Sequence, residues 1–365
     1  METLSKSNYE ESQVNSVSIE EGASLSTLYA EEALSALSCY RIDPNKKIIR
    51  PEPLLLQGDI PIYSRGNISV MGGKAKSRKT FNVALQAAAS LSGEYMGLRS
   101  GITDGSVLIV DTEQSSDFTQ KLYFRVNRIC GYDLHYTNPR LNIYALRELS
   151  FMDRCEAIEK LIHYHRPDLV FIDGIRDLIA DFNSIQESSA IVQLMMKLSS
   201  IYNCHIVNIL HTNKIDSNLR GHLGTELNNK CETAIIVESD GETSTVRPES
   251  TRNRPFEEYS FRIDDDESGL GIPVSCTSSK VEEKIDNYYY IFSSLLPNAT
   301  AMTHSALKGA LMQSLEKSES SAKKYIREAS ELEVITKRED GNYQMNPQWI
   351  IREITNDRLG QRVIP

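Results

Sequence analysis

The sequence predicts an α/β fold with a mostly parallel β-sheet and helices on both of its faces. Short apolar runs alternate along the chain with longer segments in which apolar residues recur at helical spacing. The apolar runs are nearly continuous, as in strands that are covered on both faces of a parallel sheet. Together these two observations are typical of a sheet whose strands are joined by helices.

The order of the elements follows from this alternation. Strands are expected over residues 68–71, 106–111, 141–146, 169–173 and 205–210, and helices over 27–37, 79–92, 116–130, 153–163 and 189–202. Residues 51–62 are punctuated by Pro and Gly and lead into the core. Two later strands, over 233–238 and 243–247, predict an antiparallel extension at one edge of the sheet.

Composition narrows the class of protein. Of the 365 residues, 40% are hydrophobic and 25% are charged, as in ordinary globular proteins. The sequence contains no run of about 18 apolar residues, so it predicts no membrane span. Residues 1–26 are rich in Ser and Glu and predict a disordered lead-in. The six cysteines lack metal or disulfide spacing, which favours a reducing cytoplasm. The net charge of −10 excludes a uniformly basic surface for nucleic acid.

The most informative motif lies between the first core strand and the helix that follows it. A phosphate-binding loop has the pattern G-x-x-x-x-G-K-[ST], and unpaired N–H groups at the start of the helix suit an anionic triphosphate. Position 78 departs from the pattern because Arg stands where Gly is usual, and Arg adopts positive φ less readily. The loop either binds nucleotide with one extra positive charge or is a basic loop that binds none. It consists of Gly73, Lys74, Ala75, Lys76, Ser77, Arg78, Lys79 and Thr80.

Five side chains could carry the chemistry of a nucleotide site. In a phosphate-binding loop Lys79 would reach the β- and γ-phosphates, and Thr80 would bind Mg²⁺. Asp173 ends the third buried strand and either holds Mg²⁺ through water or caps the next turn. Glu113 follows the second strand and either polarises the attacking water or is an exposed loop residue. His211 follows the last of these strands and either senses the γ-phosphate or is a buried structural imidazole.

The segment from about residue 50 to residue 260 resembles the RecA-like P-loop ATPases. The resemblance is greatest to the branch of RepA-like hexameric helicases and AAA-type replicative ATPases. The resemblance rests on RGNISVMGGKAKSRKTF, VLIVDTEQ, LVFIDGIRDL, VNILHTNK and RPESTRNRPF. It implies ATP and Mg²⁺ as cofactors, with Lys79 and Thr80 on phosphate and metal, Glu113 as the catalytic glutamate, Asp173 as the second metal residue and His211 as the γ-phosphate sensor.

The resemblance also assigns Arg252 and Arg254 as fingers that reach the ATP of a neighbouring subunit. An arginine supplied in this way stabilises charge on the transferring phosphoryl group, so that hydrolysis depends on assembly. The alternative is an exposed basic turn that balances nearby glutamates. The fingers imply a homo-oligomer, a hexamer in this family, although the sequence leaves the number of subunits open.

DNA is the expected partner. In a ring, the loops over 176–188 and 213–230 would face the centre, and basic side chains on Gly-containing loops suit single-stranded nucleic acid. The second loop carries Lys214, Arg220 and Lys230. The alternative is a surface loop with incidental charge.

The C-terminal part is expected to be a winged helix-turn-helix. Helices are predicted over 303–315 and 322–332, with Ser320 or Ser321 as the N-cap of the second, and a hairpin over 334–345 turns at Asp340-Gly341. The second helix carries Lys323, Lys324 and Arg327 and could enter the major groove. Seven basic and seven acidic residues balance over 303–345, so duplex binding and protein docking both stay open.

The predicted organisation is a lead-in (1–26), a RecA-like ATPase domain (27–263), a linker (264–286), a winged helix-turn-helix domain (287–351) and a tail (352–365). The predicted function is an ATP-dependent, ring-forming DNA motor of the helicase kind, in replication or mobilisation of a genetic element. The alternative is an ATP-gated DNA-binding regulator or loader that hydrolyses little.

Overall fold

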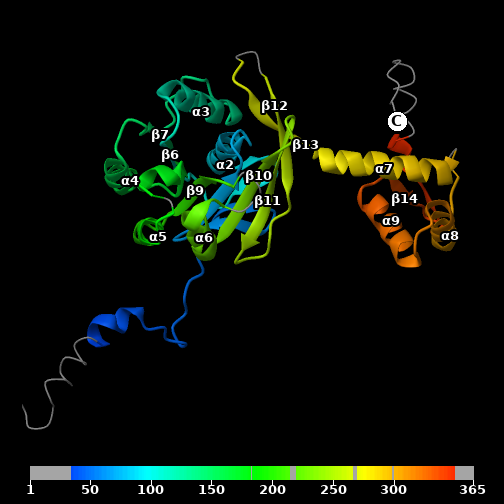
Figure 1. Ribbon diagram of the computed structural model, residues 1–365, viewed down its shortest axis with the longest axis horizontal. Coiled ribbons are helices and arrows are strands. Elements are labelled where there is room, and N and C mark those ends of the chain that lie inside the picture. Colours follow the sequence, from blue (N-terminus) through cyan, green and yellow to red (C-terminus); the bar gives the residue numbers. More distant parts are fainter. Residues whose placement is uncertain (1–33, 182, 214–218, 266–268, 298–299, 350–365) are drawn as a thin grey trace, which may run out of the picture. The chain divides into compact units, whose positions relative to one another are not determined.

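The computed structural model describes residues 34–181, 183–213, 219–265, 269–297 and 300–349 (Figure 1). Residues up to Arg50 form a separate unit. Its described part contains the 3₁₀ helix η1 (Ser38–Tyr40). The expected lead-in and tail, and most of the helix expected over 27–37, lie outside the described residues. No helix among the described residues is long and apolar enough to cross a membrane.

The main sheet confirms the predicted parallel core, but its antiparallel extension begins one strand later than expected, because the strand at 233–239 pairs parallel with the strand at 68–73. Its nine strands lie in the order β13-β12-β11-β10-β3-β9-β8-β6-β7. The six strands from β10 to β7 run parallel, and β11, β12 and β13 continue the sheet antiparallel. The bounds are β3 (Ile68–Gly73), β6 (Val107–Asp111), β7 (Leu141–Ala145), β8 (Leu169–Asp173), β9 (His205–His211), β10 (Thr233–Ser239), β11 (Thr243–Thr251), β12 (Tyr259–Asp264) and β13 (Ile272–Cys276).

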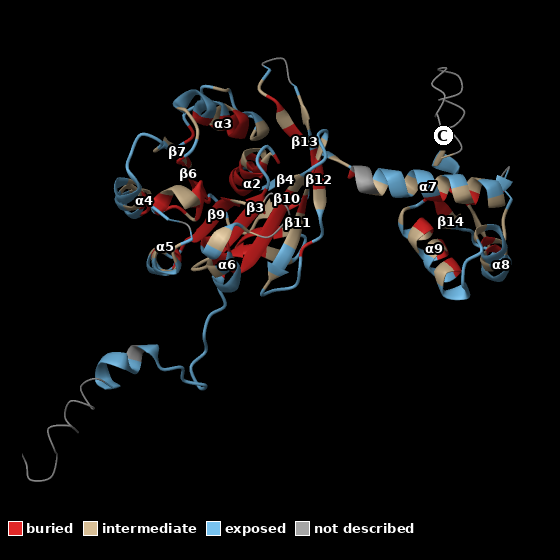
Figure 2. Ribbon diagram, in the orientation of Figure 1, coloured by how far each residue is buried: buried red, intermediate tan, exposed pale blue. Residues whose placement is uncertain are grey.

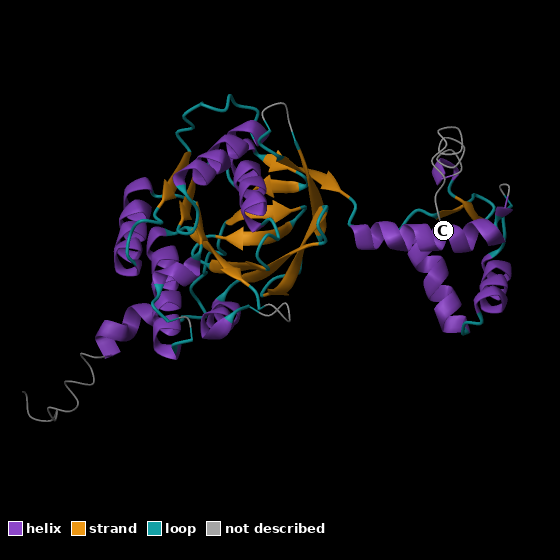
Figure 3. Cartoon of the chain, turned by 45° about the horizontal axis from the view of Figure 1, so that its top comes forward, coloured by secondary structure: helices purple, strands orange, loops and turns teal. Residues whose placement is uncertain are grey.

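Helices cover both faces of this sheet, as the sequence predicts (Figure 3). Successive side chains of a strand point to opposite faces. In β8, Leu169 and Phe171 accordingly pack into one apolar cluster with α2 and α3, and Val170 and Ile172 pack into another with α4, α5 and α6. Figure 2 shows the strands buried between these helices. The bounds are α2 (Lys79–Ser92), α3 (Ser116–Ile129), α4 (Phe151–His165), α5 (Ile185–Tyr202) and α6 (Gly221–Lys230).

A second, antiparallel sheet was not expected from the sequence. Its strands are β1 (Pro53–Gln57), β2 (Ile60–Ser64), β4 (Glu94–Tyr95) and β5 (Leu98–Ser100), in the order β2-β1-β5-β4. Leu54 and Leu55 of β1 are buried in the same cluster as the apolar face of α2. This small sheet therefore adds to the core beside the helix that follows the phosphate-loop motif.

Two predicted loops contain regular structure. The predicted linker, 264–286, holds β13, which pairs with β12, and the start of α7 (Ser279–Leu295). The predicted loop over 213–230 ends in α6, because Leu223 and Leu227 bury one helical face in the core. The loop over 176–188 is also shorter than expected, since η2 (Ile175–Leu178) precedes it and Ser184 caps α5.

The C-terminal helices and hairpin have a core of their own. Phe292 of α7, Leu307 of α8 (His304–Leu315) and Ile326 of α9 (Glu319–Glu331) pack in it, together with the hairpin of β14 (Ile335–Lys337) and β15 (Tyr343–Met345). The helix, helix, hairpin order predicted from the sequence is present. The N-cap of α9 is Ser318, whose hydroxyl accepts the Ser321 N–H, and not Ser320 or Ser321 as expected. The turn at Asp340-Gly341 is confirmed.

Candidate active site

The phosphate-loop motif links β3 to α2 at the carboxyl ends of the parallel strands. Gly73 is required by close packing, since a Cβ there would stand 2.5 Å from both the Ser77 hydroxyl and the Val237 carbonyl oxygen. Lys76 and Arg78 both adopt left-handed backbone conformations, with φ of 65° and 67°. The loop is thus tightly curled and ends directly at the first turn of a helix, where N–H groups lack intrahelical partners.

Arg78 takes up the backbone conformation that glycine usually supplies. It is the N-cap residue of α2 and lies in the left-handed region. Its guanidinium donates hydrogen bonds of 2.6 Å to the carbonyl oxygens of Gly241 and Glu242, in the turn between β10 and β11. The side chain therefore extends to this turn and leaves the inside of the loop open. The residue type at position 78 departs from the motif, but its backbone keeps the left-handed conformation that glycine would adopt there.

Lys79 lies inside the loop with its residue surface only 8% exposed. Its ammonium donates to the carbonyl oxygens of Gly73 (2.9 Å) and Lys74 (3.0 Å) and lies 3.2 Å from Nδ1 of His211. Burial lowers the pKa of Lys79, and the charges of Asp173 and Glu113 oppose that effect. A buried ammonium surrounded mostly by neutral groups is well suited to an anion.

Thr80 and Asp173 come together as the sequence predicts. The Thr80 hydroxyl donates to a carboxylate oxygen of Asp173 at 2.8 Å. Asp173 stands beside Asp111, because β6 and β8 pair in parallel with these two residues in register. Burial, and secondly the charge of Asp111, raise the pKa of Asp173 to about 6. A hydroxyl and a crowded carboxylate are ligands that suit Mg²⁺.

Glu113 and His211 face each other across the same edge of the sheet. Nε2 of His211 lies 3.5 Å from a carboxylate oxygen of Glu113, and this imidazole, more than the charge of Lys79, lowers the pKa of Glu113. With its other ring nitrogen near Lys79, His211 connects the predicted catalytic glutamate to the phosphate-loop lysine.

Asp111 and Gln114 were not among the predicted site residues. One Asp111 oxygen accepts the N–H groups of Glu113 (3.0 Å) and Gln114 (2.9 Å), which fixes the turn that carries Glu113. The Gln114 amide lies 3.4 Å from the Thr80 hydroxyl. Asp111 ends a buried strand just as Asp173 does, and this signal was available in the sequence.

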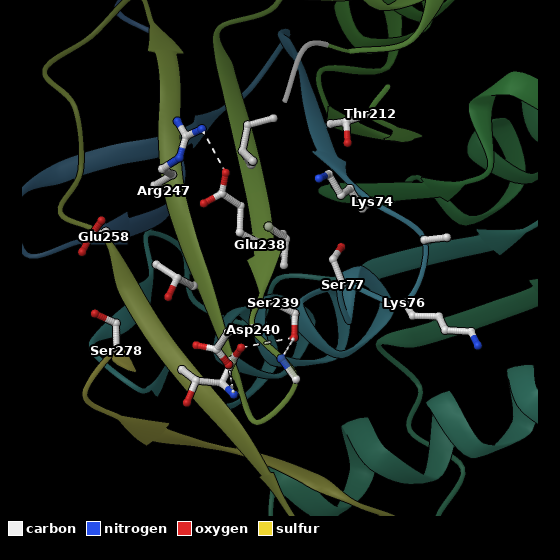
Figure 4. A pocket seen from close by; sticks show the side chains of 17 residues that line it. Lys74, Lys76, Ser77, Thr212, Glu238, Ser239, Asp240, Arg247, Glu258 and Ser278 are labelled. Atoms are coloured by element: carbon white, nitrogen blue, oxygen red, sulfur yellow. Dashed lines mark hydrogen bonds and ion pairs between the residues drawn. The ribbon is translucent and has the colours of Figure 1, made fainter. Parts of the chain in front are cut away.

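A cavity of about 630 Å³ lies beside the loop. One wall is the loop itself and the other is formed by β10, β11 and their turn (Figure 4). The polar side chains of the second wall include Glu238, Asp240 and Arg247, and Arg247 pairs with Glu238 and with Glu249. The cavity has space for a ligand that extends from the phosphate loop toward β11.

The side chains in and around the loop also suit a triphosphate and its metal ion. Within the described part of the chain, the buried Ser77 hydroxyl has no hydrogen-bond partner. It lies inside the curl that a Gly73 side chain would fill. Buried polar groups normally find partners. An orphaned hydroxyl, a buried ammonium and a contacting hydroxyl–carboxylate pair are the donor set expected for phosphate and Mg²⁺.

The predicted fingers lie away from this site. Arg252 follows β11, whose end pairs with the start of β10 at the opposite edge of the sheet. Its guanidinium donates to the carbonyl oxygens of Asn229 (3.1 Å) and Cys231 (3.0 Å). Arg254 is exposed. Their predicted role concerns a neighbouring subunit, so it stays a prediction.

The DNA-binding candidates fall into two groups. Lys214 lies outside the described residues, Arg220 precedes α6 and Lys230 is exposed in its last turn. On α9, each cation pairs with an acid four residues later or earlier. The pairs are Lys323–Glu319 (3.0 Å), Lys324–Glu328 (3.6 Å) and Arg327–Glu331 (3.6 Å).

The fold and this arrangement of residues define a RecA-like P-loop core, an α/β nucleotide-binding domain. The chain belongs to the AAA domain family, whose family model matches residues 33–217. Among solved structures, one ATPase domain is 13% identical to this chain, covers 58% of it and 86% of its own length, and superposes with a TM-score of 0.44. No curated protein sequence gives a significant match.

Proposed function

We propose that this chain binds and hydrolyses ATP with Mg²⁺. The observation that carries the proposal is the convergence of Lys79, Thr80, Asp173, Glu113 and His211 at one edge of the sheet. They come from four separate segments of the chain, and only the fold brings them together. Membership of the AAA domain family supports the same activity.

Each side chain has a distinct part in the proposed reaction. Thr80 and Asp173 would hold Mg²⁺, which when bound supplies positive charge to the phosphates. Lys79 would exchange its carbonyl partners for phosphate oxygens. Glu113 would accept a proton from the attacking water, and its lowered pKa keeps it ionised at neutral pH. His211 would orient Glu113 and report on the occupant of the loop through Lys79.

At the next level we propose a DNA motor of the helicase kind that works as a homo-oligomeric ring, in replication or mobilisation of a genetic element. A carboxylate that could position the attacking water, held 3.5 Å from His211 at the same edge of the sheet, supports turnover, which a motor needs. Single-stranded DNA in the ring channel is the proposed partner, and the exposed residues Arg252 and Arg254 are the candidates for fingers acting on a neighbour's nucleotide. The C-terminal helices and hairpin would be a winged helix-turn-helix.

The alternative is an ATP-gated DNA-binding regulator or loader with little turnover. One observation favours it. The guanidinium of Arg252 is held by two backbone carbonyls of its own chain, so its use as a finger would require these bonds to break. A protein without an effective finger would bind ATP and hydrolyse it slowly.

ATP turnover with and without single-stranded DNA separates the two. The motor predicts turnover that DNA stimulates and that Glu113→Gln abolishes while ATP–Mg²⁺ binding persists. Glu156→Gln, a change of the same chemistry on the exposed face of α4, should have no effect. Turnover of the unmodified protein as slow as that of Glu113→Gln would favour the regulator. Failure to bind ATP–Mg²⁺ in calorimetry would contradict both.

A further inference from the structure

The contact between Arg78 and the β10–β11 turn joins the two walls of the cavity. The guanidinium uses both terminal nitrogens, one on each of two successive carbonyls, Gly241 and Glu242. A second link lies nearby, where the buried Ser244 hydroxyl of β11 is 3.4 Å from the Ser77 carbonyl oxygen. The phosphate loop is thus attached by a side chain to a hairpin more than 160 residues away in sequence.

The turn that receives the guanidinium is itself braced. A carboxylate oxygen of Asp240 accepts the N–H groups of Glu242 (3.2 Å) and Thr243 (2.8 Å), and the Ser239 hydroxyl donates to the Thr243 carbonyl at 3.2 Å. Gly241 takes a φ of 112°, which only glycine adopts easily. A turn held in this way can serve as a fixed anchor for the loop.

The backbone of residue 78 explains why an anchor is needed. Left-handed conformation strains a residue with a Cβ, and glycine is nearly free of this strain. The two hydrogen bonds of the guanidinium oppose this strain, because a charged donor forms stronger hydrogen bonds than a neutral one. The clamp therefore offsets the strain at Arg78. It also aligns the start of α2, whose first residues are Lys79 and Thr80.

We propose that Arg78 is a positioning residue that clamps the phosphate loop to the β10–β11 turn, holds it in the nucleotide-ready shape and transmits nucleotide occupancy to this hairpin. The inference rests on the proposed binding of ATP. The guanidinium does not itself contact phosphate in this scheme, since both of its terminal nitrogens are directed at carbonyls. The strand β11 leads from this turn toward Arg252 and Arg254, the candidate fingers, which follow its end.

Three substitutions at this position distinguish a clamp from a charge or a strained turn. Arg78→Ala loses the clamp and keeps the strain, Arg78→Gly loses both, and Arg78→Lys keeps the charge without the two-carbonyl geometry. Release of a fluorescent ATP analogue, mant-ATP, is followed after a chase with ATP. With two hydrogen bonds lost, we expect release to be about tenfold faster in Arg78→Ala and Arg78→Lys, and about threefold faster in Arg78→Gly.

The matched control is Arg140→Ala. The Arg140 guanidinium also donates to two carbonyls, those of Leu91 (2.8 Å) and Gly105 (3.4 Å), but at the far end of α2. We expect unchanged release of mant-ATP, even where this variant is less stable to heat. If the Arg78 contact served only to stabilise the fold, Arg78→Ala and Arg140→Ala would both lower thermal stability and both release mant-ATP faster. That result would contradict the proposal.

Hydrogen exchange of the turn, residues 239–243, tests the clamp without reference to affinity. In nucleotide-free protein the turn should exchange faster in Arg78→Gly than in the unmodified chain, and added ATP–Mg²⁺ should slow its exchange only when Arg78 is present. Equal exchange in the two proteins, wild-type release in Arg78→Gly, or wild-type release in Arg78→Lys would each overturn the proposal. An unmodified protein that does not bind mant-ATP would contradict the proposed function instead, while exchange in the nucleotide-free state still reports on the clamp.

Discussion

Basic side chains are partnered differently in the α/β core and on the C-terminal helices. In the core, the cationic or basic groups of Lys79, Arg125 and His205 are buried and donate to backbone carbonyls. On α9, Lys323, Lys324 and Arg327 are exposed and pair with carboxylates one turn away. The first arrangement leaves a positive charge with mostly neutral partners, whereas the second neutralises it.

The difference bears on where anions can bind. Burial lowers the pKa of Lys79 and lowers that of Arg125 to about 10, because the charged forms lose solvation. A phosphate entering the loop would relieve that penalty at Lys79. On α9 a phosphate would have to compete with glutamates that are already in place. The core is therefore the stronger candidate for anion binding.

Replacing the buried lysine should have the largest effect on nucleotide binding. Lys79→Ala is expected to weaken ATP–Mg²⁺ binding by at least about 100-fold, or about 2.7 kcal/mol, because the charge inside the loop is lost. Titration calorimetry measures this. Lys160→Ala removes an exposed lysine from an (i, i+4) pair and should leave ATP affinity unchanged. Equal affinities for Lys79→Ala and the unmodified protein would remove the basis of the comparison.

Arg125→Ala should destabilise the core by about 3 kcal/mol. The guanidinium donates to the carbonyls of Leu270 and Gly271, both at 2.8 Å, and stacks 4.0 Å from the centre of the Phe81 ring. Urea unfolding measures the loss. Arg128→Ala, an exposed arginine on the same helix, should cost less than about 0.5 kcal/mol. Similar losses for both would show that burial is not the deciding factor.

His205 should make the protein sensitive to acid. Nδ1 donates to the Ser64 carbonyl at 2.8 Å, the ring stacks on Tyr63, and a carboxylate oxygen of Glu232 lies 3.6 Å away. Burial lowers the pKa of His205 to about 4. A histidine in the unfolded chain has a pKa of about 6.5 and therefore binds a proton more readily than the buried imidazole does. The contribution of His205 to the free energy of unfolding is therefore complete above pH 6.5 and is lost on acidification. We expect a loss of about 2 kcal/mol between pH 7.5 and pH 5.

The contribution of His205 to the pH dependence of stability is obtained by comparing wild type with a His205 variant. The pKa values of Glu232 and Asp173 are raised by burial, so these groups act in the opposite direction, and unfolding curves of wild type and His205→Gln must be compared at each pH. The stability difference should shrink toward pH 5. A pH-independent difference for His205→Gln would contradict a neutral buried imidazole.

The smallest effects are expected on α9. Removing Lys323, Lys324 and Arg327 together by alanine should change stability by less than about 1 kcal/mol, since exposed ion pairs contribute little. Duplex DNA binding gives the sharper test. If α9 contacts phosphates, the triple variant should reduce the slope of log affinity against log salt by about 2.7, which corresponds to three contacts. An unchanged slope would favour protein docking.

The parts predicted well from the sequence are those in which local pattern and burial agree. Strands such as β8 are buried on both faces and read as continuous apolar runs, which indicated the parallel core. The phosphate loop was recognisable from residue types, and Thr80 and Asp173 meet as expected. Parallel strands bring their carboxyl ends to one edge, so residues at strand ends converge whatever the loops do.

The parts that were missed depend on contacts between distant segments. The strands β4 and β5 span only two and three residues and form because β5 pairs with β1. The helix α6 lies in a region whose glycines suggested a loop, and packing of Leu223 and Leu227 overrides that tendency. The carbonyls that hold Arg252 and Arg78 have no sequence signature, because any residue supplies a backbone oxygen.

The left-handed backbone at position 78 has a consequence for how nucleotide-binding proteins are recognised. A sequence search that demands glycine at this position selects for a residue type, whereas the fold requires only a positive φ angle there. Where a distant turn offers two carbonyls to a long cationic side chain, the same angle can be reached without glycine. Degenerate motifs with a basic residue before the motif lysine are therefore worth pairing with a downstream β-hairpin before they are dismissed.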